Sequence, residues 1–165
     1  MAAEVEIEVG NRTVRISNPD RVYFPARGET KLDLARYYIS VGDGIVRALR
    51  ERPCMMHRFP SGVAGEKVHQ KRVPHGAPPW LETVRVDFPR YGRHAYELCV
   101  TELASVVWAV QMSTVEFHPW NSRRADTERP VRRAAYAFAR EVERRAPVAW
   151  RRCDGYGRVR GRRHL

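Results

Sequence analysis

The sequence contains little cysteine and no long apolar run. Its three cysteines, Cys54, Cys99 and Cys153, are far apart and show no C-x-x-C spacing. A scattered, odd-numbered set indicates neither a disulfide framework nor a zinc ribbon, and it fits a reducing compartment. No stretch approaches the about 18 consecutive apolar residues of a membrane span, and the first ten residues alternate acidic and apolar side chains where an export signal would need a basic region. We therefore expect a cytoplasmic protein with no membrane partner.

The sequence also lacks a pair of aspartates spaced for two-metal phosphoryl transfer. That chemistry needs carboxylates that bridge two ions about 4 Å apart, and Asp-x-Asp on one strand supplies them because residues i and i+2 share a face. The aspartates, none of them so spaced, are Asp20, Asp33, Asp43, Asp87, Asp126 and Asp154. We expect neither a catalytic residue of this type nor a metal site.

Positive charge, by contrast, is abundant. Thirty lysines and arginines against nineteen acidic residues give a formal net charge of +11, a field that attracts polyanions such as nucleic acids. Residues 148–165 hold six arginines and one acidic residue, Asp154, so this segment accounts for less than half of the excess. Arginine that accumulates on solvated faces in proteins from high-GC genomes is the alternative explanation.

The order of apolar patterns predicts a mixed α+β fold. Apolar residues at 5, 7 and 9 alternate with glutamates, and Gly10-Asn11 turns the chain into residues 13–16, which is typical of a β-hairpin. We expect the glutamate face of this hairpin to be exposed to solvent. After a loop over residues 17–30, Thr30 and Asp33 form a capping-box variant that starts one helix running to Leu49. This helix is expected to bury Leu34, Tyr37, Tyr38, Val41, Ile45 and Leu49.

Further hairpins and a second helix follow. Residues 54–59 and 67–73 are expected to pair around the turn at 60–62, and residues 83–88 and 94–98 form another hairpin. A helix over residues 101–112, capped by Thr101, precedes a short strand at 113–117. Residues 131–145 are helical in pattern, and 148–165 are rich in glycine and arginine with no apolar period, which is typical of a disordered segment.

Several multi-residue motifs occur in the same order as in a known family. They are SNPDRVYFP (17–25) before Thr30-Lys31, RPCMMHRFPSGV (52–63), QKRVPHGAPPW (70–80), TELASVVWAVQMSTVEFHPWNSR (101–123) and ADTERP (125–130). Over residues 3–130 the chain resembles the N-terminal part of the polymerase domain of bacterial DNA ligase D. Such domains belong to the archaeo-eukaryotic primase superfamily and act in non-homologous end joining. The resemblance implies the β-hairpins and two helices of a primase-like polymerase domain in a bacterial, nucleoid-associated protein.

The resemblance also implies a site for a DNA end. In the family, the residues that correspond to Asn18, Arg21 and Lys31 hold the 5′-phosphate of a recessed end. A phosphate there would meet free backbone N–H groups at the helix N-terminus as well as two cations. The alternative is that Asn18 and Asp20 only form an Asx turn, while Arg21 and Lys31 are solvated.

Contacts to template and nucleotide are implied at matching positions. Where the family often has a Phe pair that stacks on template bases, this sequence has Val68 and His69, a departure that weakens the stacking platform. The same basic groove is expected to include His57, Arg58, Lys71 and Arg72. His118 matches a family histidine that approaches the triphosphate of the incoming nucleotide. Each of these residues could instead be an ordinary surface or structural side chain.

The family motifs expected beyond residue 130 are missing. An Asp-x-Asp strand and a Ser-Gly-Gly-x-Gly-Leu-His strand, which bind Mn²⁺ or Mg²⁺ and a nucleoside triphosphate in intact members, do not occur. Instead residues 131–147 resemble a helix that the family places later. We therefore expect an internal deletion that joins residues 1–130 to a displaced helix at 131–147 and a basic tail at 148–165, with an incomplete catalytic sheet and no cofactor for this chain.

Three functions remain open from the sequence. The first is a non-catalytic module that binds recessed, 5′-phosphorylated DNA ends, with a separate ligase or Ku-like protein as the implied partner. The second is a nucleotidyltransferase that works alone or is completed by another chain. The third is a remnant, or a general nucleic-acid binder that acts through its basic tail.

Overall fold

The N-terminal apolar alternation forms the expected hairpin. In the computed structural model, which describes residues 3–129, β1 (Glu4–Val9) pairs antiparallel with β2 (Arg12–Ser17). Gly10 makes the turn with a φ of 61°, a left-handed conformation that glycine adopts without steric cost. Val14 and Ile16 are buried and all three glutamates of β1 are exposed, so the solvated acidic face is confirmed.

The predicted long helix is two helices. The capping box is present, because the Thr30 hydroxyl accepts from the Asp33 N–H and the Asp33 carboxylate accepts from the Thr30 N–H. However, α1 (Lys31–Ser40) ends at Val41 and α2 (Gly42–Leu49) begins directly after it. A Cβ on Gly42 would lie 2.7 Å from a methyl group of Leu103, so glycine permits close packing against the next helix where the chain changes direction. Val41 at this break is exposed, and so is Tyr37, because the buried face of α1 is formed by Leu34, Ala35 and Tyr38; both residues had been predicted to be buried.

A five-stranded sheet forms the larger part of the described fold. Its strands are β5 (Pro53–Arg58), β6 (Val68–Gln70), β7 (Thr83–Phe88), β8 (Arg93–Cys99) and β9 (Thr114–Pro119). β5 is central: β9 runs along one edge of it, while β8 and then β6 occupy the other edge, all antiparallel. β7 pairs with β8 outside, and a 3₁₀ turn at Pro89–Tyr91 joins these two strands. The predicted strands are therefore confirmed, although their order could not be read from the sequence.

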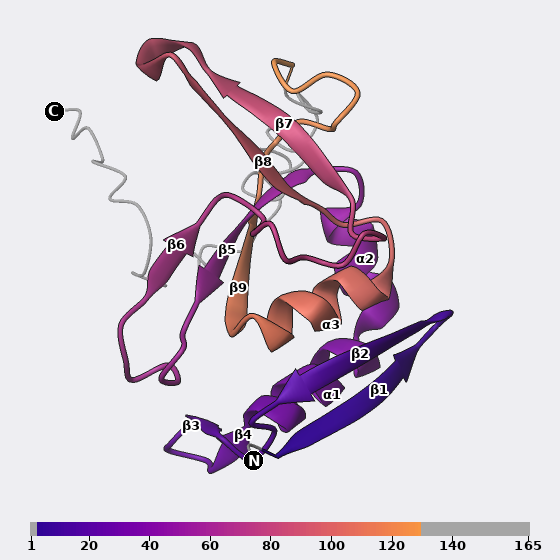
Figure 1. Ribbon diagram of the computed structural model, residues 1–165, viewed down its shortest axis with the longest axis vertical. Coiled ribbons are helices and arrows are strands. Elements are labelled where there is room, and N and C mark those ends of the chain that lie inside the picture. The colour runs from indigo at the N-terminus through magenta and orange to yellow at the C-terminus, as the bar shows by residue number, and fades with distance from the viewer. Residues whose placement is uncertain (1–2, 130–165) are drawn as a thin grey trace, which may run out of the picture. The chain divides into compact units, whose positions relative to one another are not determined.

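A single buried helix connects the hairpin to the sheet. α3 (Leu103–Gln111) packs against β2 and α1 on one side and β9 on the other, and Figure 1 shows it between the N-terminal hairpin and the sheet. Its residues 104–110 are all buried, which follows from their nearly uninterrupted apolar character. The predicted cap was wrong, because Glu102 and not Thr101 is the N-cap residue and it makes no side-chain capping bond.

Two short strands that the sequence analysis missed, β3 (Val22–Phe24) and β4 (Glu29–Thr30), pair inside the loop before α1. None of the three α-helices within residues 3–129 has the length and apolar character needed to cross a membrane. The predicted helix at 131–147 and tail at 148–165 lie outside the described residues. The fold of the described part is mixed α+β, as expected.

Candidate functional site

The loop after β2 folds back onto the start of α1. Asn18 takes a left-handed conformation with a φ of 51°, which asparagine tolerates better than most residues. Its carbonyl accepts from the Arg21 N–H at 3.2 Å, and the Arg21 carbonyl accepts from the Lys31 N–H at 2.8 Å. These bonds bring Asn18, Arg21 and Lys31 into one corner, which we call the cationic corner and which also includes Arg58.

The expected free N–H groups at the start of α1 are already occupied. The Lys31 N–H donates to the Arg21 carbonyl, the Leu32 N–H to the Pro19 carbonyl at 3.0 Å, and the Asp33 N–H to the Thr30 hydroxyl. This corrects the expectation that a phosphate would bind to open backbone donors there. The loop itself caps the helix, so any anion in the corner has to be held by side chains.

Lys31 is a buried cation and not a surface one. Only 4% of the residue is exposed, and its ammonium donates to the Ser17 carbonyl at 2.9 Å and to Gln111 Oε1 at 2.8 Å. Burial, followed by the charges of Arg21 and Arg58, lowers the pKa of Lys31 from 10.5 to about 8. An ammonium has three N–H donors, so one remains beyond these two bonds.

The cations of the corner bond to neutral oxygens within the described residues. Arg21 Nη1 donates to the Pro60 carbonyl at 2.5 Å, and the Arg58 guanidinium donates to the Met112 carbonyl and to Gln70 Oε1. Such bonds fix the positions of the guanidinium groups without neutralising them. The corner therefore carries uncompensated positive charge, which favours an anionic ligand.

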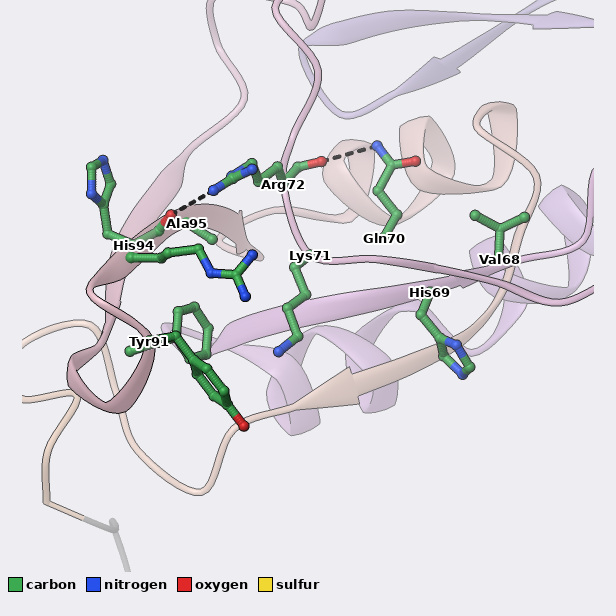
Figure 2. Close-up of a pocket in the computed structure, with 10 residues that line it drawn as sticks. Val68, His69, Gln70, Lys71, Arg72, Tyr91, His94 and Ala95 are labelled. Carbon is green, nitrogen blue, oxygen red and sulfur yellow. Dashed lines mark hydrogen bonds between the residues drawn. The ribbon is translucent and has the colours of Figure 1, made fainter.

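A groove of about 700 Å³ lies between the strand region of β6 and the β7–β8 hairpin. Its walls combine basic, aromatic and small side chains, namely Val68, His69, Gln70, Lys71, Arg72, Phe88, Tyr91, Arg93, His94 and Ala95. Figure 2 shows that Lys71 and His69 extend to one side of the chain and Gln70 to the other, as strand alternation requires. The Arg72 guanidinium donates to the His94 carbonyl at 3.0 Å and so ties the segment after β6 to the hairpin.

Aromatic rings and cations alternate in this groove. The Lys71 ammonium lies 4.5 Å from the centroid of the Phe88 ring, and the guanidinium carbons of Arg90 and Arg93 lie 5.8 and 5.6 Å from that of Tyr91. Tyr91 is 61% exposed at the hairpin turn. A ring flanked by cations is suited to stack on a base while the cations meet phosphates.

Of the predicted groove residues, four line the groove and two do not. Val68, His69, Lys71 and Arg72 line it, whereas His57 is buried and Arg58 belongs to the cationic corner. Sequence reasoning missed Phe88, Tyr91 and Arg93 because they come from a different hairpin. The only signal was the aromatic and arginine-rich turn FPRYGR (88–93).

Three histidines and a glutamate gather around β5. In the sheet register, His57 lies opposite His69 of β6 on one side and opposite Glu116 of β9 on the other. His118 follows Glu116 by two residues and therefore points to the same face. The His57 and His118 rings are stacked with centroids 3.6 Å apart, and the His69 ring meets His57 edge-on at 4.4 Å.

Glu116 is the centre of this histidine cluster. Its Oε2 lies 2.8 Å from His57 Nδ1, 2.9 Å from Lys67 Nζ and 3.5 Å from His118 Nε2. The hydrogen bonds from His57 and Lys67 lower the pKa of Glu116 to about 2, so it is ionised at neutral pH. Burial lowers the pKa of His57 in spite of this carboxylate. The cluster therefore presents an ionised carboxylate between imidazole rings.

Comparison with known families identifies a relationship over most of the described chain. Residues 30–134 match the family described as "LigD, primase-polymerase domain". The chain is similar to the protein named "Multifunctional non-homologous end joining protein LigD" from Pseudomonas aeruginosa, with 34% identity over 139 residues, or 84% of this chain and 16% of that protein. A protein of the same name from Mycolicibacterium smegmatis is 34% identical over 64% of this chain and 14% of its own length.

A solved structure shares the fold. The polymerase domain of Mycobacterium tuberculosis ligase D, determined in complex with DNA, superposes with a TM-score of 0.63 and 28% sequence identity. The superposition covers 67% of this chain and 38% of that domain. The chain therefore spans about one sixth of the length of the Pseudomonas relative and well under half of the solved polymerase domain.

Proposed function

Because the chain belongs to the family of LigD primase-polymerase domains, we propose that it binds recessed, 5′-phosphorylated DNA ends and does not transfer nucleotides. The observation that carries the proposal is the cationic corner, where Arg21, Lys31 and Arg58 come together and bond only to neutral oxygens among the residues described. A terminal phosphate dianion matches this charge, and a charge-assisted hydrogen bond is about twice as strong as a neutral one.

Within the corner we assign different roles to the three predicted residues. The Arg21 guanidinium, on an exposed residue, is the direct phosphate ligand. Lys31 supplies positive charge from its buried position and one remaining N–H, while the left-handed turn at Asn18 positions the loop. Because the helix N–H groups are occupied, Arg21 carries more of the contact than the sequence analysis expected.

The groove is proposed to hold the nucleic acid strand that continues from the end. Val68, His69, Lys71 and Arg72 line one wall, and the hairpin supplies Tyr91 on the other. His57 and Arg58, which the sequence analysis also assigned to the groove, are proposed to support it from the sheet. The exposed His118, at the end of β9, is proposed to approach phosphate oxygens, as its family counterpart does.

The absence of nucleotidyl transfer is proposed from the missing carboxylates. No two aspartates of the chain are separated by one residue, so the arrangement that holds two ions in the family has no counterpart here. Among the described residues, β9 pairs only with β5, which leaves its other edge where further strands of a catalytic sheet would add. We propose an internal deletion at the junction of residues 130 and 131 and, as in the family, a separate ligase or Ku-like partner.

The proposal is tested with recessed DNA duplexes that differ only in the 5′-phosphate. Fluorescence anisotropy on the full chain should show tighter binding to the phosphorylated end, and Arg21→Gln should remove that preference. Arg36→Gln, which removes the same charge from the exposed face of α1, should keep it. Equal affinity of the unaltered chain for both ends would overturn the proposal. Primer extension with Mn²⁺ and nucleoside triphosphates should yield no product.

A general nucleic-acid binder that acts through its arginine-rich segment is the second candidate. The six arginines of residues 148–165 favour it. A chain that ends at residue 147 distinguishes the two functions. If the protein is a general binder, this truncated chain loses its affinity for DNA. If it is an end-binding module, the truncated chain still prefers 5′-phosphorylated ends.

A further inference from the structure

The histidine cluster contains a ligand set for a metal ion, a role beyond the phosphate contact proposed for His118 and the support of the groove proposed for His57. His57, Glu116 and His118 each offer one donor atom, and these atoms lie within 4.8 Å of one another. Two imidazole nitrogens and one carboxylate oxygen are ligands that zinc and neighbouring divalent transition metals accept, whereas Mg²⁺ and Ca²⁺ prefer oxygen ligands alone. We propose that His57, Glu116 and His118 bind one divalent transition-metal ion, with Zn²⁺ as the reference ion.

The sheet register fixes the position of His57 relative to Glu116. His57 lies on the central strand directly opposite Glu116, and it is only 6% exposed, so its ring cannot swing away. Glu116 and His118 are two residues apart on β9 and share a face. Ligands on paired strands are held more precisely than ligands on loops.

The two ring nitrogens of His57 have different surroundings. Nδ1 lies 2.8 Å from Glu116 Oε2, whereas Nε2, on the other edge of the ring, is buried and makes no hydrogen bond within the described residues. An ion that Glu116 also binds is therefore held by Nδ1, and the neutral ring carries its proton on Nε2.

The metal has to compete with one cation. Lys67 Nζ lies 2.9 Å from the same Glu116 oxygen that faces the two histidines. The Lys67 side chain is 38% exposed and belongs to the turn before β6, so it can withdraw to solvent or move to the other carboxylate oxygen. His118, with half of its side chain exposed, rotates to complete the set. Water or a phosphate oxygen fills the remaining coordination position.

The test uses the full chain without an affinity tag and without DNA. Zn²⁺ affinity is measured by competition with a chromophoric chelator, and Co²⁺ is added to record its visible absorption, which reports coordination number and ligand type. One equivalent of metal is expected to bind. His118→Asn and Glu116→Gln should each weaken binding at least tenfold, because both remove a ligand from a partly exposed position without touching the core.

Matched controls separate this site from other ligands of the chain. His75→Asn removes an exposed histidine outside both the cluster and the groove, and Cys153→Ser with His164→Asn removes the donors near the C-terminus; binding should persist in both variants. Circular dichroism and thermal melting verify that each variant is folded. The proposal is overturned if the unaltered chain binds no metal, if His118→Asn binds as tightly as the unaltered chain, or if the C-terminal double variant loses the metal.

Discussion

The Lys31 ammonium and the Gln111 side-chain oxygen are joined by a hydrogen bond of 2.8 Å, although 80 residues separate them in the sequence. The same oxygen accepts from the Ser17 N–H at 2.8 Å, and the Gln111 amide group donates to the Ser17 hydroxyl. The last residue of α3 thus holds the end of β2 and the first residue of α1 together. Within the cationic corner, Gln111 therefore holds Lys31, while other groups hold Arg21 and Arg58.

Removal of the Gln111 amide is expected to destabilise the fold. Gln111→Leu leaves a buried ammonium and a backbone N–H short of partners, and we expect the free energy of unfolding to fall by about 1 to 3 kcal/mol. In a Lys31→Met background the same substitution should cost less, because no charge is then left unpaired. Urea denaturation of the four chains of this double-mutant cycle measures the difference. An equal cost in both backgrounds would show that the two side chains are not coupled.

The preference for a 5′-phosphate is expected to depend on pH through Lys31. Its pKa of about 8 means that the ammonium is charged below pH 8 and loses its proton as the pH rises above that value. The phosphate stays a dianion over this range, since its second pKa is about 6. The affinity ratio between phosphorylated and unphosphorylated ends should therefore be larger at pH 7 than at pH 9.

The control for this pH effect is the Lys31→Met variant. Its affinity ratio between phosphorylated and unphosphorylated ends should be smaller at pH 7 than that of the unaltered chain and should not change between pH 7 and pH 9.

The pH dependence of stability gives an independent check of the Lys31 pKa shift. The unfolded chain, with an ordinary lysine pKa of 10.5, binds more protons than the folded chain between pH 8 and 10.5, so Lys31 makes unfolding less favourable as the pH rises through that window. A ratio that stays constant from pH 7 to 9 in the unaltered chain would contradict the assignment of Lys31.

Stacking on Tyr91 is expected to contribute to single-strand binding in the groove. Tyr91→Ala should weaken binding of a short single-stranded oligonucleotide by about 1 to 3 kcal/mol, because an aromatic side chain that stacks on a base contributes this amount. Tyr91→Phe keeps the ring and should bind nearly as well as the unaltered chain. Tyr96→Ala, which removes another exposed tyrosine that does not line the groove, tests whether the effect is local. Isothermal titration measures all four affinities.

Glu97 is expected to be a source of instability at neutral pH. The residue is fully buried, Trp120 Nε1 donates to its Oε2 at 2.9 Å, and its Oε1 has no partner within residues 3–129. Burial raises the pKa of Glu97, so the protonated form is favoured in the folded state and the stability that it contributes falls as the pH rises. Glu97→Gln keeps an acceptor for Trp120 and should raise the free energy of unfolding at pH 7 by about 1 to 3 kcal/mol.

The gain in the free energy of unfolding from Glu97→Gln should become smaller toward low pH, where Glu97 of the unaltered chain is itself neutral. Glu66→Gln, an exposed substitution of the same kind, should change stability little at either pH. Thermal melts at pH 4 and pH 7 compare the three chains. A destabilised Glu97→Gln chain at pH 7 would mean that the charged carboxylate has a partner that the described residues do not provide.

Local patterns predicted most elements, and the failures arose from one long-range contact and from strands too short to show a pattern. Short segments bounded by turn and loop residues predicted every strand of the larger sheet, and Thr30 with Asp33 predicted the start of α1. The break at Val41 was missed because it depends on the approach of Gly42 to Leu103, a residue 61 positions later. The pair β3 and β4 was missed because strands of three and two residues are too short to show a period.

The sequence by itself determined that Asn18, Arg21 and Lys31 lie near one another, since they are close in the chain and a turn and a capped helix connect them, whereas Arg58 joins the cationic corner from β5. Tertiary structure alone decided which of their donors remain available, because Gln111 and the loop carbonyls reach them from distant or folded-back segments. The same holds for the meeting of His57 with Glu116, which are 59 residues apart. Alternation along a strand tells which side chains share a face, but strand order and register decide which of them meet, and both arise from packing of the whole sheet.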